Sequence, residues 1–192
     1  SWAGEHRAPL REARVYPAPV QRPLPVWVAV GGNPHSVVRA ARLGLPMALG
    51  IIGGAPEQFA GLAALYREAA RRAGHEPAPA LSLNLHGFVA DSAQAAADIY
   101  YPAHSAVMNR IGRERGWAPT NRAAFDAMVQ LRGAYVVGSP AEVTEKILFH
   151  HQVFGHQRTL IQPAIGDVAH RDVLRAIELL GTEVAPAVRA EV

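Results

Sequence analysis

The segment PVWVAVGGNPHS, residues 25–36, carries the pattern that decides the fold. It begins with a continuous apolar run over residues 26–30, which is typical of a strand buried on both faces. A glycine pair ends the run. Asn33 and Pro34 then form a helix start, in which asparagine caps the helix and proline takes the first helical position. Strand, glycine turn and helix in this order predict one βα unit of a parallel sheet.

The same order recurs along the chain. Further strands are predicted over residues 46–52, 81–89 and 158–162, and each is followed by a helical pattern. The helix after residue 89 is expected to begin at about Ser92 with Asp91 as its cap, and the last helix is expected over residues 170–180. Four such units predict an α/β fold with right-handed crossovers between parallel strands. They fit either a small open sheet or half of an eight-unit barrel.

The fourth unit is interrupted. Residues 100–132 are predicted to form a helical insertion, and residues 134–137 a short apolar segment after it. Ser139 and Glu142 then have the spacing of a capping box, which predicts a helix that runs to about Phe154. The first 25 residues contain five prolines, so we expect an extended arm or loop that leads in from an upstream segment, with residues 26–192 as the folded unit.

Composition excludes several classes of function. The 192 residues contain no cysteine, which rules out disulfides and thiolate metal sites. The net charge of +3 comes from scattered arginines, so we expect no nucleic-acid partner. No apolar run approaches the ~20 residues of a membrane helix, so no membrane association is expected. A cytoplasmic globular protein is the expectation.

The first candidate site is the turn after the first strand, made of Gly31, Gly32, Asn33, His35 and Ser36. Backbone amides and the positive end of a helix suit an anion such as a phosphate, and the two side chains could add donors. The alternative is that the glycines only permit a tight turn while Asn33 caps the helix. Neither the dinucleotide fingerprint nor the P-loop pattern is present.

The second candidate site is the end of the next strand, where Ile52 precedes Gly53 and Gly54. Parallel α/β proteins bind ligands at the carboxyl ends of their strands. Two neighbouring strands that both end in glycine pairs indicate a flat ligand resting on backbone, although two compact turns would explain them equally well.

The polar residues elsewhere define no catalytic group. Among the nine histidines no pair has the spacing of metal ligands, so no metal is expected. His86 and His104 are interpreted as core or rim histidines rather than functional ones, and Trp117 as a packing residue of the insertion. No acid–base pair can be assigned, and the catalytic residues stay unknown.

Five segments together resemble the bacterial luciferase-like flavin-dependent monooxygenases. They are residues 25–41, 49–54, 137–147, 158–162 and 177–186, and their order and spacing cover nearly the whole chain. The resemblance implies a TIM barrel, of which this chain would supply the C-terminal half, about strands five to eight. It further implies a partner that completes the barrel, either an N-terminal half or a second copy of the chain.

The resemblance also implies an activity and a cofactor. The cofactor would be reduced FMN, or a deazaflavin coenzyme in sister branches, and the reaction would be oxygenation of a small organic substrate, with a flavin reductase as a further partner. Gly31, Gly32, Asn33, His35 and Ser36 match the segment that holds the cofactor phosphate. Ile52, Gly53 and Gly54 match the strand end near the flavin ring. Two alternatives stay open: a non-catalytic half-barrel module that binds flavin or phosphate, and a small doubly wound domain with an unrelated phosphate ligand.

Overall fold

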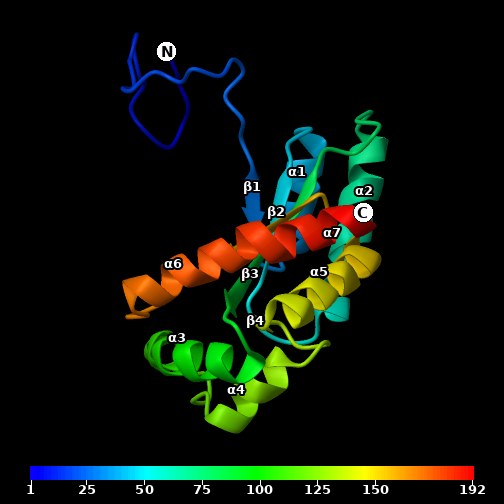
Figure 1. The fold of residues 1–192 in the computed structure, drawn as a ribbon. Coiled ribbons are helices and arrows are strands. Elements are labelled where there is room, and N and C mark those ends of the chain that lie inside the picture. Colours follow the sequence, from blue (N-terminus) through cyan, green and yellow to red (C-terminus); the bar gives the residue numbers. More distant parts are fainter.

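A computed structural model describes residues 1–192 and contains one sheet of five parallel strands (Figure 1). The strands are β1 (Val28–Val30), β2 (Met47–Ile51), β3 (Leu81–Val89), β4 (Val136–Gly138) and β5 (Arg158–Gln162). Every strand pair is parallel, and helices follow the strands along the chain. The prediction of an α/β fold built from parallel βα units is confirmed.

The sheet follows chain order with one added strand. β1 pairs with β2, β2 with β3, and β5 with the other side of β3 along Ser82–His86. β4 pairs only with the last three residues of β3, Gly87–Val89. The sequence predicted four strands, and this short fifth strand extends the sheet at the carboxyl end of β3. β1 and β5 each have one unpaired edge.

Large apolar side chains occupy one face of the sheet, and helices cover it. Val30, Leu49 and Leu83 lie side by side in the paired strands and are buried. The helices are α1 (Pro34–Arg42), α2 (Ala60–Arg72), which the 3₁₀ turn η1 (Pro56–Phe59) precedes, α5 (Pro140–Phe154), and α6 (His170–Leu179). The capping box predicted at the start of α5 is confirmed by reciprocal hydrogen bonds between Ser139 and Glu142.

The chain continues in helical form beyond the predicted end of the last helix. After α6 come a π-helical turn, η2 (Leu180–Val184), and α7 (Ala185–Glu191). Together they form a continuous rod across the molecule (Figure 1). The α-helix α6 thus ends one residue before the predicted end, and the helical continuation after it was not predicted. Pro186 has no backbone N–H to donate to the preceding turn, and it follows directly on the π-helical turn η2, where the regular α-helical hydrogen-bond ladder is already interrupted.

The opposite face of the sheet carries mostly small or polar side chains. Ala48, Ser82 and Arg158 form one row across β2, β3 and β5, and Gly50, Asn84 and Leu160 form the next row toward the carboxyl ends. On this face β2 carries no large apolar side chain, and β3 carries one only near its carboxyl end, at Phe88. Most side chains on this face of β2 and β3 therefore project little above the backbone of the sheet.

A second helical layer lies beyond the carboxyl ends of the strands, where α3 (Ala93–Arg115) and α4 (Arg122–Val129) pack together (Figure 1). Ser92, and not the predicted Asp91, caps α3, because its hydroxyl accepts a hydrogen bond of 3.2 Å from the Ala95 amide. The Asp91 carboxylate instead pairs with Arg175 of α6 at 2.6 Å. The insertion predicted over residues 100–132 thus comprises the second half of α3 together with α4, and its status as a separate insertion stays a prediction.

Residues 1–26 are all exposed and extend away from the amino end of β1 (Figure 1). Their one regular feature is an antiparallel bridge between Trp2 and Leu10, with two backbone hydrogen bonds of 2.8 Å. The division into an arm and a folded unit stays a prediction. None of the helices combines the length and apolar character needed to span a membrane.

Candidate functional site

A cavity of about 610 Å³ opens at the carboxyl ends of β1 and β2, a volume in the range of small-molecule sites. It brings together three of the predicted site residues, Gly31, Ile52 and Gly53. Its complete lining also draws on the second helical layer: Gly31, Gly50, Ile52, Gly53, Phe59, Met108, Arg115, Trp117, Ala118, Thr120 and Tyr135.

Glycine backbone forms one side of this cavity. A Cβ atom placed on Gly31 or Gly53 would meet no atom within 4 Å, so both positions face open space. Gly50 lies beside Gly31 in the paired strands and extends the same side chain-free surface. The backbone on this side is therefore open to close approach by a flat ring system. Phe59, Trp117 and Tyr135 add aromatic walls.

The turn after β1 supplies free hydrogen-bond donors. The backbone amides of Gly31, Gly32 and Asn33 donate to no other group of the chain. The first amides of α1 are in use, because the His35 amide donates to the Asn33 side chain at 2.9 Å and the Ser36 amide to the Asn33 carbonyl at 3.1 Å. Asn33 is thus the helix cap that the sequence predicted. The donors available to an anion belong to the turn rather than to the helix.

The other predicted residues lie around this turn. Gly32 and Gly54 have φ angles of 102° and 79°, a backbone conformation that favours glycine. Ser36 is half-buried in α1. The exposed His35 lies with Arg39 in a separate shallow depression on the outer side of α1. The structure therefore places His35 outside the cavity that Gly31 lines.

Sequence reasoning missed the wall of the cavity that α3 and the loop after it provide. Trp117 was interpreted as a packing residue, but its side chain is 45% exposed and lines the cavity. The Arg115 guanidinium lies 5.3 Å from the centre of the Trp117 ring. A hydrogen bond of 2.7 Å from the Thr120 amide to Asn109 of α3 fixes this loop. The change from helix to loop at Gly116, followed by an aromatic residue, was the available signal.

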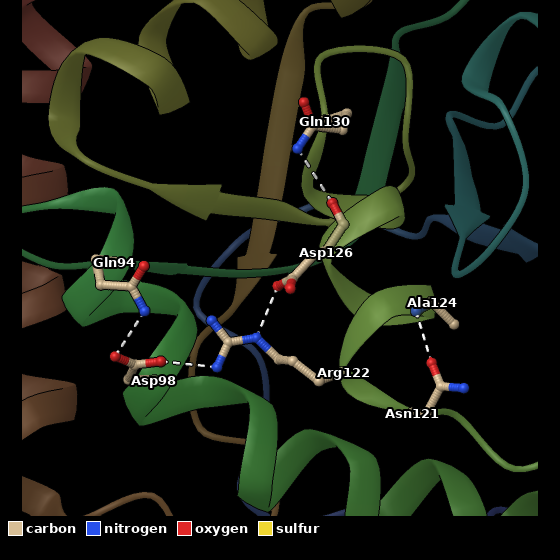
Figure 2. A network of polar contacts seen from close by, with 7 residues as sticks. All are labelled: Gln94, Asp98, Asn121, Arg122, Ala124, Asp126 and Gln130. Atoms are coloured by element: carbon tan, nitrogen blue, oxygen red, sulfur yellow. Dashed lines mark hydrogen bonds and ion pairs between the residues drawn. The ribbon is translucent and has the colours of Figure 1, made fainter.

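A polar network ties α4 to α3 (Figure 2). The Arg122 guanidinium donates to Asp98 of α3 at 2.7 Å and to Asp126 of α4 at 2.8 Å. Hydrogen bonds from Gln94 and from Arg122 hold the pKa of Asp98 below its ordinary value. Asn121 caps α4 by accepting a hydrogen bond of 2.8 Å from an amide of its first turn. These hydrogen bonds hold α3 and α4, the two helices of the second layer, together.

The buried ammonium group of Lys146 positions Tyr135 from the other side. Its Nζ donates to the carbonyl oxygens of Tyr135 and Gln130, each at 2.6 Å, and to that of Val129 at 2.9 Å. No carboxylate accompanies it, and burial lowers the pKa of Lys146 to about 7. The single lysine of the chain thus joins the end of α4, the start of β4 and helix α5.

Two histidines meet beneath Tyr135. Nδ1 of His86, on β3, lies 3.1 Å from Nε2 of His104, on α3. The Tyr135 ring stacks on His86 at 6.1 Å between centres and meets His104 edge-on at 4.5 Å. Burial lowers the pKa of His86, and it lowers that of His104 to about 4. Both are core or rim residues as predicted, but the sequence did not indicate that they contact each other.

Comparison with known proteins assigns the chain to a family. The model of the luciferase-like monooxygenase family matches residues 1–157. The chain belongs to this family. No curated protein sequence matches it significantly.

Solved structures agree with this assignment. The monooxygenase RslO1 from Streptomyces bottropensis is 26% identical, with a TM-score of 0.68 over 89% of this chain and 50% of its own. The oxygenating constituent of 3,6-diketocamphane monooxygenase from the CAM plasmid of Pseudomonas putida, solved in complex with FMN, is 22% identical, with a TM-score of 0.62 over 84% of this chain and 48% of its own.

A third structure represents a different cofactor. The coenzyme F420-dependent tetrahydromethanopterin reductase from Methanopyrus kandleri is 16% identical, with a TM-score of 0.56 over 85% of this chain and 50% of its own. At this identity, as for the diketocamphane enzyme, the likeness shows the fold alone. The chain spans about half the length of these structural relatives.

Proposed function

We propose that this chain is the C-terminal half of a flavin-dependent monooxygenase that uses reduced FMN and a small organic substrate. The observation that carries the proposal is the glycine-lined cavity at the ends of β1 and β2, with unpaired amides at residues 31–33 beside it. Family membership supports it, because this cavity lies where parallel α/β proteins bind ligands.

The residues present fit such a cofactor. The turn amides of Gly31, Gly32 and Asn33 suit the phosphate, and the exposed Arg115 guanidinium at the same cavity adds a positive charge. The backbone at Gly50 and Gly53 suits one face of a flat ring. Reduced FMN, when bound, would supply the oxygen-activating chemistry. The chain's own residues would bind and orient it, while Trp117 and Phe59 exclude water from the cavity.

Binding measurements test the proposal. We expect FMN to quench the tryptophan fluorescence of the chain with micromolar affinity. Riboflavin, which lacks the phosphate, should bind at least about tenfold more weakly, which corresponds to about 1.4 kcal/mol. Tighter binding of coenzyme F420 than of FMN would assign the site to a deazaflavin instead. The absence of binding by any flavin or deazaflavin at micromolar concentration would contradict the proposal.

The second candidate is a non-catalytic half-barrel module that binds flavin. The unpaired edges of β1 and β5 favour it, since a second copy of the chain could pair with them as an N-terminal half would. Turnover in the presence of a flavin reductase and NAD(P)H separates the two functions. Flavin binding without substrate oxygenation, in every assembly that the chain forms, would favour the module.

A further inference from the structure

We infer that His86 binds the ligand of this cavity by donating a hydrogen bond from Nε2, and that His104 is the positioning residue that sets this tautomer. The inference rests on the proposed function and adds a side chain to the proposed site. It makes the ligand group next to His86 a hydrogen-bond acceptor, such as a carbonyl oxygen or an unprotonated ring nitrogen.

The position of His86 follows from the strand register. Ile51 of β2 pairs with Leu85 of β3, so His86 lies across from Ile52, which lines the cavity. On its other side His86 pairs with Gln162 of β5. His86 thus occupies the carboxyl end of a central strand, on the sheet face that the glycines share.

The two ring nitrogens of His86 have different surroundings. Nδ1 is used by His104, whereas Nε2 has no hydrogen-bond partner in the chain and is not enclosed by protein atoms. His104 differs, because its ring is completely buried and its Nδ1 lacks any partner. Of the four nitrogens in the pair, Nε2 of His86 is the only one open to a new partner. His86 is not itself among the residues that line the cavity, but it adjoins two that are, Ile52 across the sheet and Tyr135, on which its ring stacks.

The buried, unpaired Nδ1 of His104 determines which ring donates in the hydrogen bond between His86 and His104. Each neutral imidazole carries one N–H, so the bond between the rings has two directions. If His104 accepted, its Nδ1–H would be a buried donor with no partner. If His104 donates through Nε2–H, its Nδ1 is instead a buried acceptor, and among backbone groups a buried N–H without a partner is rarer than a buried carbonyl without one. His86 then accepts at Nδ1 and must carry its proton on Nε2.

The surroundings keep both rings neutral. The titratable groups facing the pair are the phenols of Tyr100 from α3 and Tyr135 from the start of β4, and Phe125 of α4 completes the contact. No carboxylate contributes to the pKa shift of either histidine. A neutral pair near pH 7 can therefore offer one N–H to a ligand without bringing a positive charge into the core.

Nitrogen NMR of the chain with ¹⁵N-labelled histidine tests the tautomer. At about pH 7 we expect His86 as the neutral Nε2–H form in the wild type. His104→Phe removes the donor to Nδ1 and should give a mixture of the two tautomers, whereas His104→Gln supplies a new N–H and should restore the Nε2–H form. His150→Phe, which removes a buried histidine from α5, is the matched control and should leave the His86 signals unchanged.

The tautomer result can overturn the inference without any ligand. An Nδ1–H form of His86 in the wild type would do so even if His104→Phe does not fold, and so would a His86 signal that is the same in all His104 variants.

Titration with FMN tests the ligand contact. We expect FMN to shift the His86 Nε2 signal, and His86→Phe to weaken FMN binding about tenfold. Equal FMN affinity in the wild type and in His86→Phe would overturn the ligand contact while leaving the proposed function intact. If FMN fails to bind the wild type, the proposed function fails, and the ligand contact that rests on it fails as well.

Discussion

The guanidinium group of Arg158 lies over the indole ring of Trp27, 4.7 Å from its centre. Trp27 directly precedes β1 and Arg158 begins β5, so this contact joins the two edge strands across the polar face of the sheet. Beneath it lie Ala48 and Ser82, whose small side chains leave room for the contact and are buried. The sheet is therefore closed over at its amino end, whereas the carboxyl end carries the cavity.

Removing this contact should loosen the edges of the sheet. We expect Arg158→Ala to lower the free energy of unfolding by about 1 kcal/mol, the typical strength of a partly exposed cation–π contact. The fluorescence of Trp27 should shift to longer wavelength as the ring becomes more exposed to water. Arg171→Ala, which removes an exposed ion pair with Asp172, is the control and should change neither quantity. Urea unfolding that does not distinguish the two variants would contradict the prediction.

The glycine surface of the cavity can be filled without disturbing the fold. Gly53→Val adds a side chain whose Cβ meets no protein atom within 4 Å, so it should narrow the cavity and weaken FMN binding at least about tenfold. The control is Gly61→Val on α2, where the added Cβ also meets no protein atom within 4 Å and the residue does not line the cavity. Both variants should unfold within about 1 kcal/mol of the wild type. An unchanged affinity in Gly53→Val would exclude this surface as part of the flavin site.

Acid should destabilise the chain through its buried histidines. Burial lowers the pKa of His104 and His156 to about 4 and that of His150 to about 3, all below the unfolded value of about 6.5. Between these values the unfolded chain binds more protons than the folded chain, so stability falls as the pH drops below about 6.5. At about pH 5 each of these histidines should cost about 2 kcal/mol.

The variant His150→Phe isolates the contribution of one histidine to this loss of stability in acid. His150 is fully buried and neither of its ring nitrogens has a partner, so the phenyl ring removes a titrating group without breaking a hydrogen bond. The variant should lose less stability than the wild type between about pH 7 and pH 5, measured by urea unfolding at each pH. Parallel pH profiles for the two proteins would show that His150 titrates normally.

Lys146→Met should detach Tyr135 from α5. The substitution leaves the carbonyl oxygens of Tyr135, Gln130 and Val129 without their donor, and we expect a loss of about 2 kcal/mol in the free energy of unfolding. Because the folded pKa of Lys146, about 7, lies below its unfolded value, wild-type stability should rise from about pH 7 to pH 9. Lys146→Met should lack this rise. Lys146→Arg keeps a hydrogen-bond donor but does not titrate in this range, so it separates the loss of the hydrogen bonds from the loss of the titrating group.

Local patterns in the sequence predicted most of the strands and caps. β3 has the predicted bounds, because its apolar residues recur at every second position from Leu81 to Leu85, which is the period of a strand. Asn33 and Ser139 are the predicted caps, since the capping hydrogen bonds join residues that are close in sequence. The exception is Asp91, whose carboxylate is drawn to Arg175, 84 residues away.

The candidate site was less predictable because it is assembled from distant segments. Trp117 lines the cavity only because α3 folds back over the ends of the strands. His86 and His104 are 18 residues apart and meet only through the packing of α3 on β3. Conversely, His35 follows directly on the turn that lines the cavity, yet the first turn of α1 carries it to the outer surface.

Because the edges of β1 and β5 are open, the stability of this sheet depends on the concentration of anything that binds to them. Each edge presents a row of backbone donors and acceptors that water or an added strand can satisfy. Anything that binds the folded sheet through these groups shifts the folding equilibrium in proportion to the logarithm of its concentration. The melting temperature of the chain then depends both on its own residues and on the concentration of any strand that pairs with Val28–Val30 or Arg158–Gln162.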